Sequence, residues 1–256
     1  RLAVHGVAAL WSASFLAFGG TGDLHMPSTL ASIIVIALVL AWSSNLYNFM
    51  DGNDGLAASM GAIGFTAYGL ASLSGHAAAS PEPIQSPRST AAFFALAAAI
   101  LPFLAVNAPR ASMFLGDVGA VPLGFLAAAF GVGGTLHGTW PAWFPLLVFL
   151  PFIADATLTL AARVRRRERV WEGHKDHFYQ RLHRLGAGHS GTLAIYVVAM
   201  LGTSATALAC LSAHPEAGWW SLAAWIAVVC VSFAVIDYHW RKKTTKKTEM
   251  PAPSPP

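Results

Sequence analysis

The stretch NLYNFMDGNDGL, residues 45–56, lies between two apolar segments and carries two carboxylates, Asp51 and Asp54. Ionisable groups at the ends of apolar helices cost free energy unless something compensates them, so clusters of them indicate sites. The two aspartates are three positions apart and would face the same direction on a helical turn. Gly52 and Gly55 leave the backbone open to a ligand such as a phosphate. The alternative interpretation is a polar turn whose aspartates cap the next helix.

Apolar residues dominate the rest of the chain as well. Hydrophobic residues make up 55% of it and charged residues 11%, whereas soluble domains carry roughly 25% charged residues. We therefore predict an all-α fold, a polytopic transmembrane helical bundle with about eight spans of membrane-crossing length. The predicted spans lie near residues 2–18, 29–49, 56–74, 91–107, 119–135, 142–162, 191–212 and 218–238.

The orientation follows from the basic residues, because short cytoplasmic loops carry the excess of Lys and Arg. These residues collect between 163 and 184 and again after 240. Counting spans back from these two regions predicts that three loops face the cytoplasm and that four lie outside. The cytoplasmic loops are residues 50–55, 108–118 and 163–190, and the external ones are 19–28, 75–90, 136–141 and 213–217. The acidic loops and the basic loop are thus predicted on one face.

The external loops are too short for a second folded domain. We predict one transmembrane domain over residues 1–240 and a basic, Pro-rich, disordered cytoplasmic tail over 241–256. The chain begins at Arg1, so we expect that the N-terminal part of the protein is missing. The basic loops account for the net charge of +4. We expect no nucleic-acid partner, because no basic face interleaved with aromatic residues is present.

A third carboxylate, Asp117, lies in FLGDVG, residues 114–119, just before another apolar segment. One interpretation is an N-cap of the fifth span, since Asp is a good N-cap. That role is compatible with metal binding, because a carboxylate at a helix start can also present an oxygen to a divalent cation. Mg²⁺ is typically held by one or two carboxylates together with substrate phosphates. Asp117 is therefore a candidate magnesium ligand.

The basic loop contains HKDHFYQRLHR, residues 174–184, in which cations, donors and aromatic rings alternate. Clusters of Arg, Lys and His suit a pyrophosphate through charge-assisted hydrogen bonds. The alternative is a positive-inside loop or contact with anionic lipids. Asp155 lies inside the sixth predicted span and needs a partner, so its role is either structural or a support for the site. Together these residues indicate phosphoryl chemistry on a soluble diphosphate, with a lipid partner among the apolar helices.

These residues resemble a known family. Residues 45–56 are similar to the Asn-x-x-Asn-x-x-Asp-Gly-x-Asp-Gly-Leu signature of polyprenyl-phosphate N-acetylhexosamine-1-phosphate transferases, the family of MraY and WecA. Residues 107–119 resemble its second signature, and His177 with Arg181 resembles its histidine loop. The resemblance implies transfer of N-acetylhexosamine 1-phosphate from a UDP-sugar to a polyprenyl phosphate, such as undecaprenyl phosphate, with release of UMP.

The resemblance also implies the setting of the reaction. It implies Mg²⁺, or alternatively Mn²⁺, as the cofactor and the cytoplasmic face of the bacterial inner membrane as the location. The expected process is the first membrane step of O-antigen or other cell-envelope polysaccharide synthesis. The sequence leaves open whether the protein forms a homodimer.

By position, the resemblance assigns a role to each candidate residue. The expected catalytic residues are Asp51, Asp54 and Asp117, with Asp117 as the metal ligand. The expected substrate-binding residues are Asn45, Asn48, His174, His177 and Arg181, with His177 at the diphosphate.

The chain departs from the family pattern at positions that bear on catalysis and on sugar specificity. The family's adjacent aspartate pair lies upstream of a span that resembles the one at residue 2, so it is absent here. Tyr179 and Gln180 replace further histidines, and the HFYQR form resembles members that start O-antigens.

Two alternatives to the transferase function are a transporter or flippase for a lipid-linked substrate and an inactive truncated remnant. A transporter predicts charges near the membrane midplane and broken helices in repeat-related positions.

Overall fold

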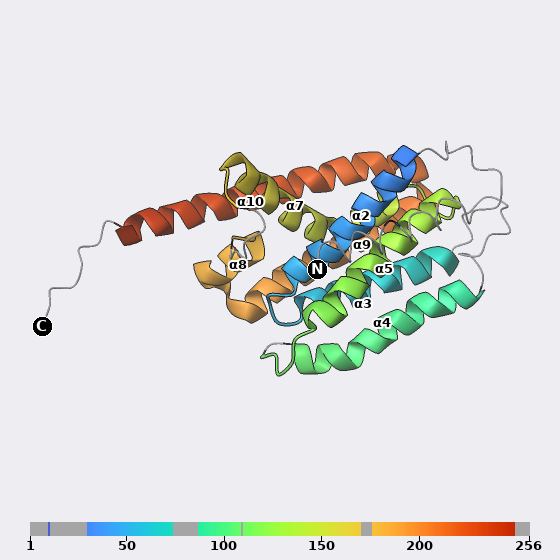
Figure 1. Ribbon diagram of the computed structural model, residues 1–256, viewed down its shortest axis with the longest axis horizontal. Coiled ribbons are helices and arrows are strands. Elements are labelled where there is room, and N and C mark those ends of the chain that lie inside the picture. The colour runs from blue at the N-terminus through green and yellow to red at the C-terminus, as the bar shows by residue number, and fades with distance from the viewer. Residues whose placement is uncertain (1–9, 11–29, 74–86, 109, 170–175, 249–256) are drawn as a thin grey trace, which may run out of the picture.

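The computed structural model describes residue 10 and residues 30–73, 87–108, 110–169 and 176–248. Within these residues every regular element is helical, and the long helices lie side by side in one bundle (Figure 1). The predicted all-α membrane bundle is confirmed. The α-helices are α2 (Leu30–Met50), α3 (Leu56–Leu73), α4 (Pro87–Asn107), α5 (Gly116–Leu136), α6 (Trp143–Val148), α7 (Leu150–Arg165), α8 (Phe178–Leu182), α9 (Gly188–Ala213) and α10 (Gly218–Thr248). A π-helical turn (His183–Ala187) and a 3₁₀ turn (Pro215–Ala217) join the last three.

Six helices among the described residues are long and apolar enough to cross a membrane. The predicted span at 2–18 lies outside the described residues. The sixth predicted span, 142–162, is divided at Phe149 into α6 and α7. Pro151 is the reason, because it lacks the N–H that would continue the helical hydrogen bonds. Within the described residues this is the one predicted span that is divided, so the repeat-related pair of broken helices that a transporter predicts does not appear there.

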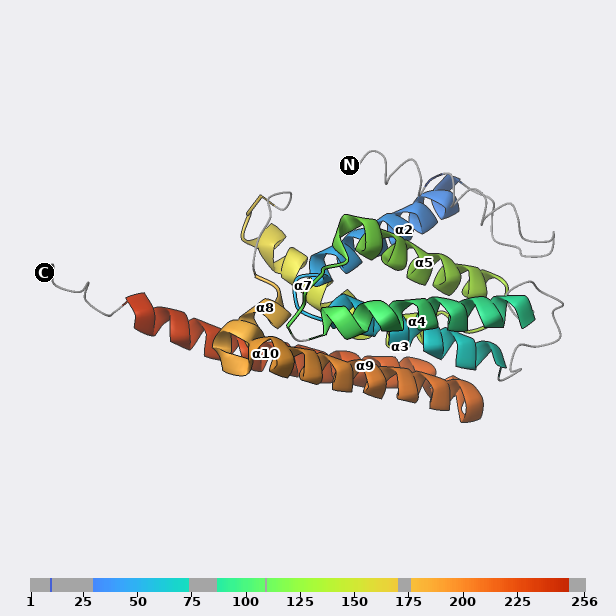
Figure 2. The same cartoon turned by 90° about the horizontal axis from the view of Figure 1, so that it is seen from below.

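The end of α10 corrects another prediction. The helix continues to Thr248, so residues 241–248, predicted as the start of a disordered tail, are helical. Lys and Arg are good helix formers, and Arg241 donates to Asp237 one turn earlier, with 2.7 Å between Nε and Oδ2. Residues 249–256 lie outside the described residues. The last turns of α10 project beyond the rest of the bundle (Figures 1 and 2).

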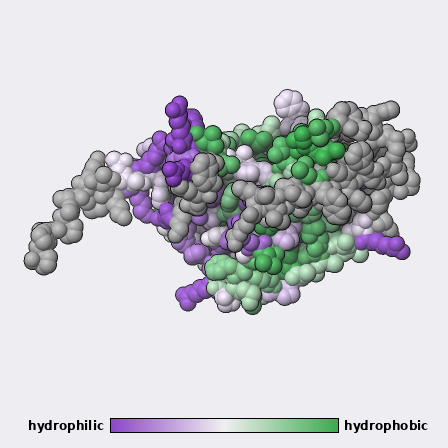
Figure 3. Space-filling model, in the orientation of Figure 1, coloured by the Kyte–Doolittle hydropathy of each residue, from purple (hydrophilic) through white to green (hydrophobic). Residues whose placement is uncertain are grey.

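The distribution of hydrophobic residues on the surface is the one expected of a protein whose sides contact lipid. Hydrophobic residues gather across the middle of the face seen in Figure 3, and hydrophilic ones lie toward the end that carries α8. Large apolar side chains remain exposed on the outer helices, for example Val198 on α9 and Val231 on α10. Such an apolar exterior would be unfavourable in water, whereas lipid tails accommodate it. The protein is therefore a multi-pass membrane protein.

Helices α2 and α5 pack closely because of one glycine. Gly124 on α5 lies against the backbone of α2, and an added Cβ would come 2.4 Å from the carbonyl oxygen of Ser43. The Ser43 hydroxyl donates to the Gly124 carbonyl oxygen at 2.8 Å. Small residues and serine hydroxyls are typical of close helix contacts in membranes. This contact fixes where α5 begins relative to the end of α2, and both ends contribute to the site described below.

We predict that Gly124→Ala lowers the free energy of unfolding by about 1–3 kcal/mol, because the new methyl group overpacks the contact. Thermal unfolding of the purified protein in detergent measures the change. Gly191→Ala on α9 is the matched control, since its Cβ would meet only the Ala187 methyl at 3.3 Å. Equal stability of the two variants would show that the close approach is not required.

Candidate active site

Three polar connections meet at one end of the bundle. They are the turn between α2 and α3, the connection from α4 to α5, and the segment from α8 to the start of α9 (Figures 1 and 2). Asn107 accepts a hydrogen bond from the Gly55 N–H, with 3.0 Å between Oδ1 and N. Asp54 accepts one from the Ala111 N–H, with 3.1 Å between Oδ2 and N. The acidic loops therefore form one contiguous structure.

Asp51 lies against the first turn of α5. Its Oδ2 accepts a hydrogen bond from the Gly116 N–H at 2.9 Å, which satisfies one of the unpaired donors of the helix N-terminus and also benefits from the helix dipole. The N-cap position of α5 is Leu115, which has no capping side chain. Asp117 is in the first turn and exposed, so the N-cap interpretation of Asp117 is wrong. Asp51, from the α2–α3 turn, and Asp117, on α5 itself, are thus both located at the first turn of α5.

The position of Asp51 has an electrostatic cost. Burial disfavours its charged form and raises its pKa to about 6, while the hydrogen bond from Gly116 opposes part of the rise. A bound cation would favour the ionised form of this carboxyl group.

Asp54 and Asn53 connect the same turn to α9. Asp54 is buried, and its Oδ1 lies 3.3 Å from Nδ1 of His189. The Asn53 side-chain amide donates to the carbonyl oxygens of Asp54 and His189, at 3.2 Å and 3.3 Å. The acidic turn is therefore held from both sides, by the α4–α5 connection and by the first turn of α9. His189 is far away in the sequence, and its spacing gave no signal of this contact.

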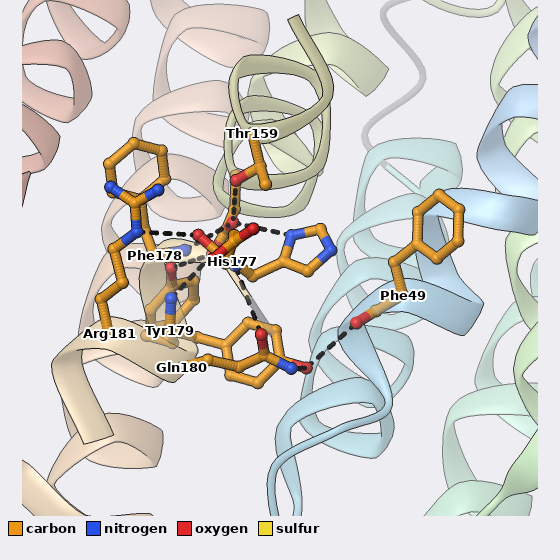
Figure 4. Close-up of polar contacts among 10 residues, drawn as sticks. Phe49, Thr159, His177, Phe178, Tyr179, Gln180 and Arg181 are labelled. Carbon is orange, nitrogen blue, oxygen red and sulfur yellow. Dashed lines mark hydrogen bonds and ion pairs between the residues drawn. The ribbon is translucent and has the colours of Figure 1, made fainter. Parts of the chain in front are cut away.

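The histidine loop is organised around one buried carboxylate, Asp155 on α7. Figure 4 shows the loop residues His177, Phe178 and Tyr179 with their polar contacts. Five groups donate to Asp155: the N–H groups of Phe178 and Tyr179, Nδ1 of His177, and the hydroxyls of Thr159 and Tyr196. The backbone bonds are each 3.0 Å long, and the His177 bond is 3.1 Å. Donation by Nδ1 sets the tautomer of the neutral ring. Asp155 therefore supports the site by anchoring the first turn of α8.

Asp155 holds His177 away from the surface. His177 is only 3% exposed, and its ring lies 5.7 Å from that of Tyr179 and 5.9 Å from that of Phe49, between centroids. Tyr179 in turn donates its hydroxyl to the Phe49 carbonyl oxygen at 3.1 Å. The ring of Tyr179 covers Gly52, where an added Cβ would come 2.1 Å from the tyrosine oxygen. A glycine is thus required where α8 meets the acidic turn.

The other predicted substrate-binding residues do not all lie in the same surroundings. Asn45 is partly buried in α2 and donates to the Ala41 carbonyl oxygen at 2.7 Å. Asn48 is one turn later and also partly buried. The Arg181 guanidinium is buried and faces Asp237 on α10 rather than the acidic turn. His174 lies outside the described residues.

A cavity of about 240 Å³ opens where these elements meet. Its lining residues are Gly52, Asn53, Tyr179, Gln180, His183, Arg184 and His189. The rings of His183 and His189 lie 4.3 Å apart, and Nδ1 of His183 is buried with no hydrogen-bond partner among the described residues. The cavity thus offers imidazole and guanidinium groups beside the acidic turn, which is the composition expected for a phosphate-bearing ligand.

The donor set suits a hard cation that keeps several ligands from water or substrate. No group of three or more His, Cys, Asp or Glu side chains that could hold a metal occurs among the described residues. Mg²⁺ does not need one, because one or two carboxylates together with substrate phosphates commonly suffice. Asp117 and Asp51, at the first turn of α5, are the residues present that fit this requirement.

Comparison with known proteins identifies the family. The model of glycosyl transferase family 4 matches residues 1–135, more than half of the chain. This chain belongs to glycosyl transferase family 4. The family match includes both acidic connections, and the longer matches to individual relatives extend beyond it.

The relatives are transferases of sugar phosphates by name. The decaprenyl-phosphate N-acetylglucosaminephosphotransferase of Mycobacterium leprae (strain TN) is 29% identical over an alignment of 201 residues, which covers 73% of this chain and 50% of the relative. Its counterpart in Mycobacterium tuberculosis (strain ATCC 25618 / H37Rv) is 28% identical over an alignment of 210 residues, which covers 76% of this chain and 50% of the relative. The phospho-N-acetylmuramoyl-pentapeptide-transferase of Shouchella clausii (strain KSM-K16) is 34% identical over an alignment of 134 residues. This alignment covers 49% of this chain and 38% of the relative. This family 4 chain spans about half the length of the first two relatives.

We predict that Asp155→Asn destabilises this family 4 protein by about 3–5 kcal/mol, because it leaves buried donors facing an amide. Thr159→Val, which removes one of the five donors, should cost only about 1 kcal/mol. Thermal unfolding in detergent compares the two variants. A loss for Asp155→Asn no larger than that for Thr159→Val would show that Asp155 does not organise the loop.

A second prediction concerns the pH dependence of stability. The raised pKa of Asp51 means that the folded state holds this proton more tightly than the unfolded chain, whose Asp pKa is about 3.9. Without Mg²⁺, ionisation of Asp51 should therefore lower stability as the pH rises from about 4 through about 6. Asp51→Asn should match the wild-type protein at about pH 4 and exceed it at about pH 8. Unfolding in the presence of a chelator tests this, and a less stable variant at about pH 8 would contradict it.

Proposed function

We propose that the intact protein transfers N-acetylhexosamine 1-phosphate from a UDP-sugar to a polyprenyl phosphate and releases UMP. Two observations carry the proposal: the carboxylates Asp51 and Asp117 at the first turn of α5, and a cavity lined by imidazole and guanidinium groups that begins at Gly52, next to Asp51. Membership of glycosyl transferase family 4 and the names of the relatives support the same reaction.

In this reaction, an oxygen of the lipid phosphate forms a bond to the β-phosphorus of the UDP-sugar. The bond between that phosphorus and the bridging oxygen breaks, and its electron pair leaves with UMP. Negative charge gathers on the phosphates, so catalysis requires positioned cationic groups and donors. Arg184 and His183 line the cavity, and we propose that they contact the diphosphate. His177, for which the resemblance implies this role, is buried against Asp155 and would instead support Tyr179.

Asp117 and Asp51 would hold Mg²⁺, or Mn²⁺ in its place. The ion would supply neutralisation of charge on the diphosphate, which is typically worth several kcal/mol. Asp54 is bonded to Ala111 and His189 and keeps the acidic turn in shape. Asn45 and Asn48, on the last turns of α2, are proposed to contact the nucleotide sugar.

The setting of the reaction is also a proposal. The basic residues of the α7–α8 connection and of α10 favour the cytoplasm for the end that carries the site. A bacterial inner membrane would supply the lipid from the side, between the apolar helices. The product would start an O-antigen or another cell-envelope polysaccharide. N-acetylglucosamine, named in the mycobacterial relatives, is the first sugar to test.

We predict that Asp117→Asn lowers UMP release by about 10²-fold or more, because a metal contribution of several kcal/mol is lost. The assay uses purified full-length protein, undecaprenyl phosphate, Mg²⁺ and a panel of UDP-N-acetylhexosamines. Glu216→Gln is the matched control, since Glu216 is an exposed acid in the turn before α10 at the opposite end of the bundle. Near-normal turnover of a correctly inserted Asp117→Asn protein would contradict the metal assignment. No UMP release from the wild-type protein with any donor would contradict the proposed reaction.

A further inference from the structure

Helix α8 has five residues and carries part of the cavity wall. A helix this short is not stable alone in water, because nucleation is unfavourable and few hydrogen bonds follow. Asp155 on α7 holds one side of its first turn. Contacts on the other side come from α10, the last helix of the chain (Figure 1).

The first of these contacts is an ion pair. Arg181 on α8 donates to Asp237 on α10, with 2.6 Å between the guanidinium Nη1 and Oδ1. The side chains are 7% and 29% exposed, so the pair is shielded from water more than an ordinary surface pair. The same guanidinium donates through Nε to the Asp176 carbonyl oxygen at 2.8 Å. Arg181 therefore connects α10 to the residue immediately before His177.

The second contact is aromatic. The Phe178 ring stacks on Phe233 of α10, with 3.9 Å between centroids and 5° between planes. Phe233 and Asp237 are four positions apart and lie on the same face of α10, while Phe178 and Arg181 are three apart on α8. The two pairs are therefore in register, and they fix both the position and the rotation of α8.

The end of α10 also holds the π-helical turn that follows α8. Lys243 donates to the Arg184 carbonyl oxygen at 2.5 Å, and the Arg184 guanidinium lies 5.9 Å from the centre of the Trp240 ring. Arg184 lines the cavity. The helical extension beyond residue 240 thus continues the same contact surface.

We infer that α10 positions the cavity wall, with Asp237 and Phe233 as positioning residues that act through Arg181 and Phe178. The inference deepens the proposed function and rests on it for its kinetic consequence, whereas its structural consequence is independent. Neither Asp237 nor Phe233 lines the cavity. Their loss should therefore loosen α8 and move Tyr179, Gln180 and Arg184 without removing any ligand contact.

The structural test is hydrogen–deuterium exchange of full-length protein in detergent, followed over residues 176–187. Asp237→Ala should raise exchange of this segment by about tenfold or more, while α3 and α5 stay as in the wild-type protein. Ser232→Ala is the matched control, because Ser232 is exposed on the same helix and its hydroxyl bonds within α10 to Val228. If Asp237→Ala does not fold, Asp237→Asn and Phe233→Leu carry the test. Unchanged exchange in the folded variants would overturn the inference.

The kinetic test separates this inference from the proposed function. We expect Asp237→Ala to reduce kcat/KM for UMP release by about 10²-fold, since small misplacement of binding groups has large effects. Asp237→Glu, which keeps the charge, should recover most of the loss. Faster exchange in Asp237→Ala together with no UMP release from the wild-type protein would uphold the positioning role and contradict the transferase proposal. Normal kcat/KM in a variant with faster exchange would contradict the positioning of the cavity.

Discussion

Carboxylates of one element accept hydrogen bonds from the backbone N–H groups of another at the polar end of this bundle. Asp51 accepts from Gly116 and Asp54 accepts from Ala111. Asp155 accepts from the first turn of α8. Loops at the end of an apolar bundle have few hydrophobic contacts, and unpaired backbone donors are costly. These three carboxylates pair backbone donors and also connect the loops to one another. In this way they hold the walls of the cavity in place.

The same arrangement links structure to chemistry. Asp51 accepts a hydrogen bond from one N–H of the α5 N-terminus, yet burial raises its pKa to about 6, so this bond compensates its charge only in part. Asp117 on the same helix turn is exposed. A cation between substrate phosphates and these groups would supply the missing compensation. Carboxylates whose charge is incompletely compensated suit the cation and the charged substrate proposed for this site.

Apolar patterning predicted the six long helices that the described residues form, because length and hydropathy determine membrane spans. It also predicted the shared position of the acidic loops, which the bond between Asp54 and Ala111 confirms. It could not predict the division of the sixth span at Phe149, since a proline in a membrane helix is often tolerated. The predicted disorder after residue 240 was wrong up to Thr248 because α10 continues through good helix formers.

Contacts between distant elements were harder to foresee. The contacts of His189, Asp237 and Asp155 join elements that are far apart in the sequence. Which side chains meet depends on how the helices are rotated against one another, and local residue spacing does not reveal this. Arg181 is one example: the resemblance predicts that it binds substrate, which stays a prediction, and gave no sign that its guanidinium pairs with Asp237 on α10.

The three polar connections of the proposed site, α2–α3, α4–α5 and α8–α9, are expected to lie together on the cytoplasmic side of the membrane. Cysteine labelling in intact cells tests this expectation most directly, in a protein whose two native cysteines are replaced by alanine. Ser112→Cys and Lys242→Cys should react only with membrane-permeant reagents, whereas Arg88→Cys and Glu216→Cys, at the other end, should react with impermeant ones. Labelling of Ser112→Cys and Lys242→Cys from opposite sides of the membrane would contradict a single site.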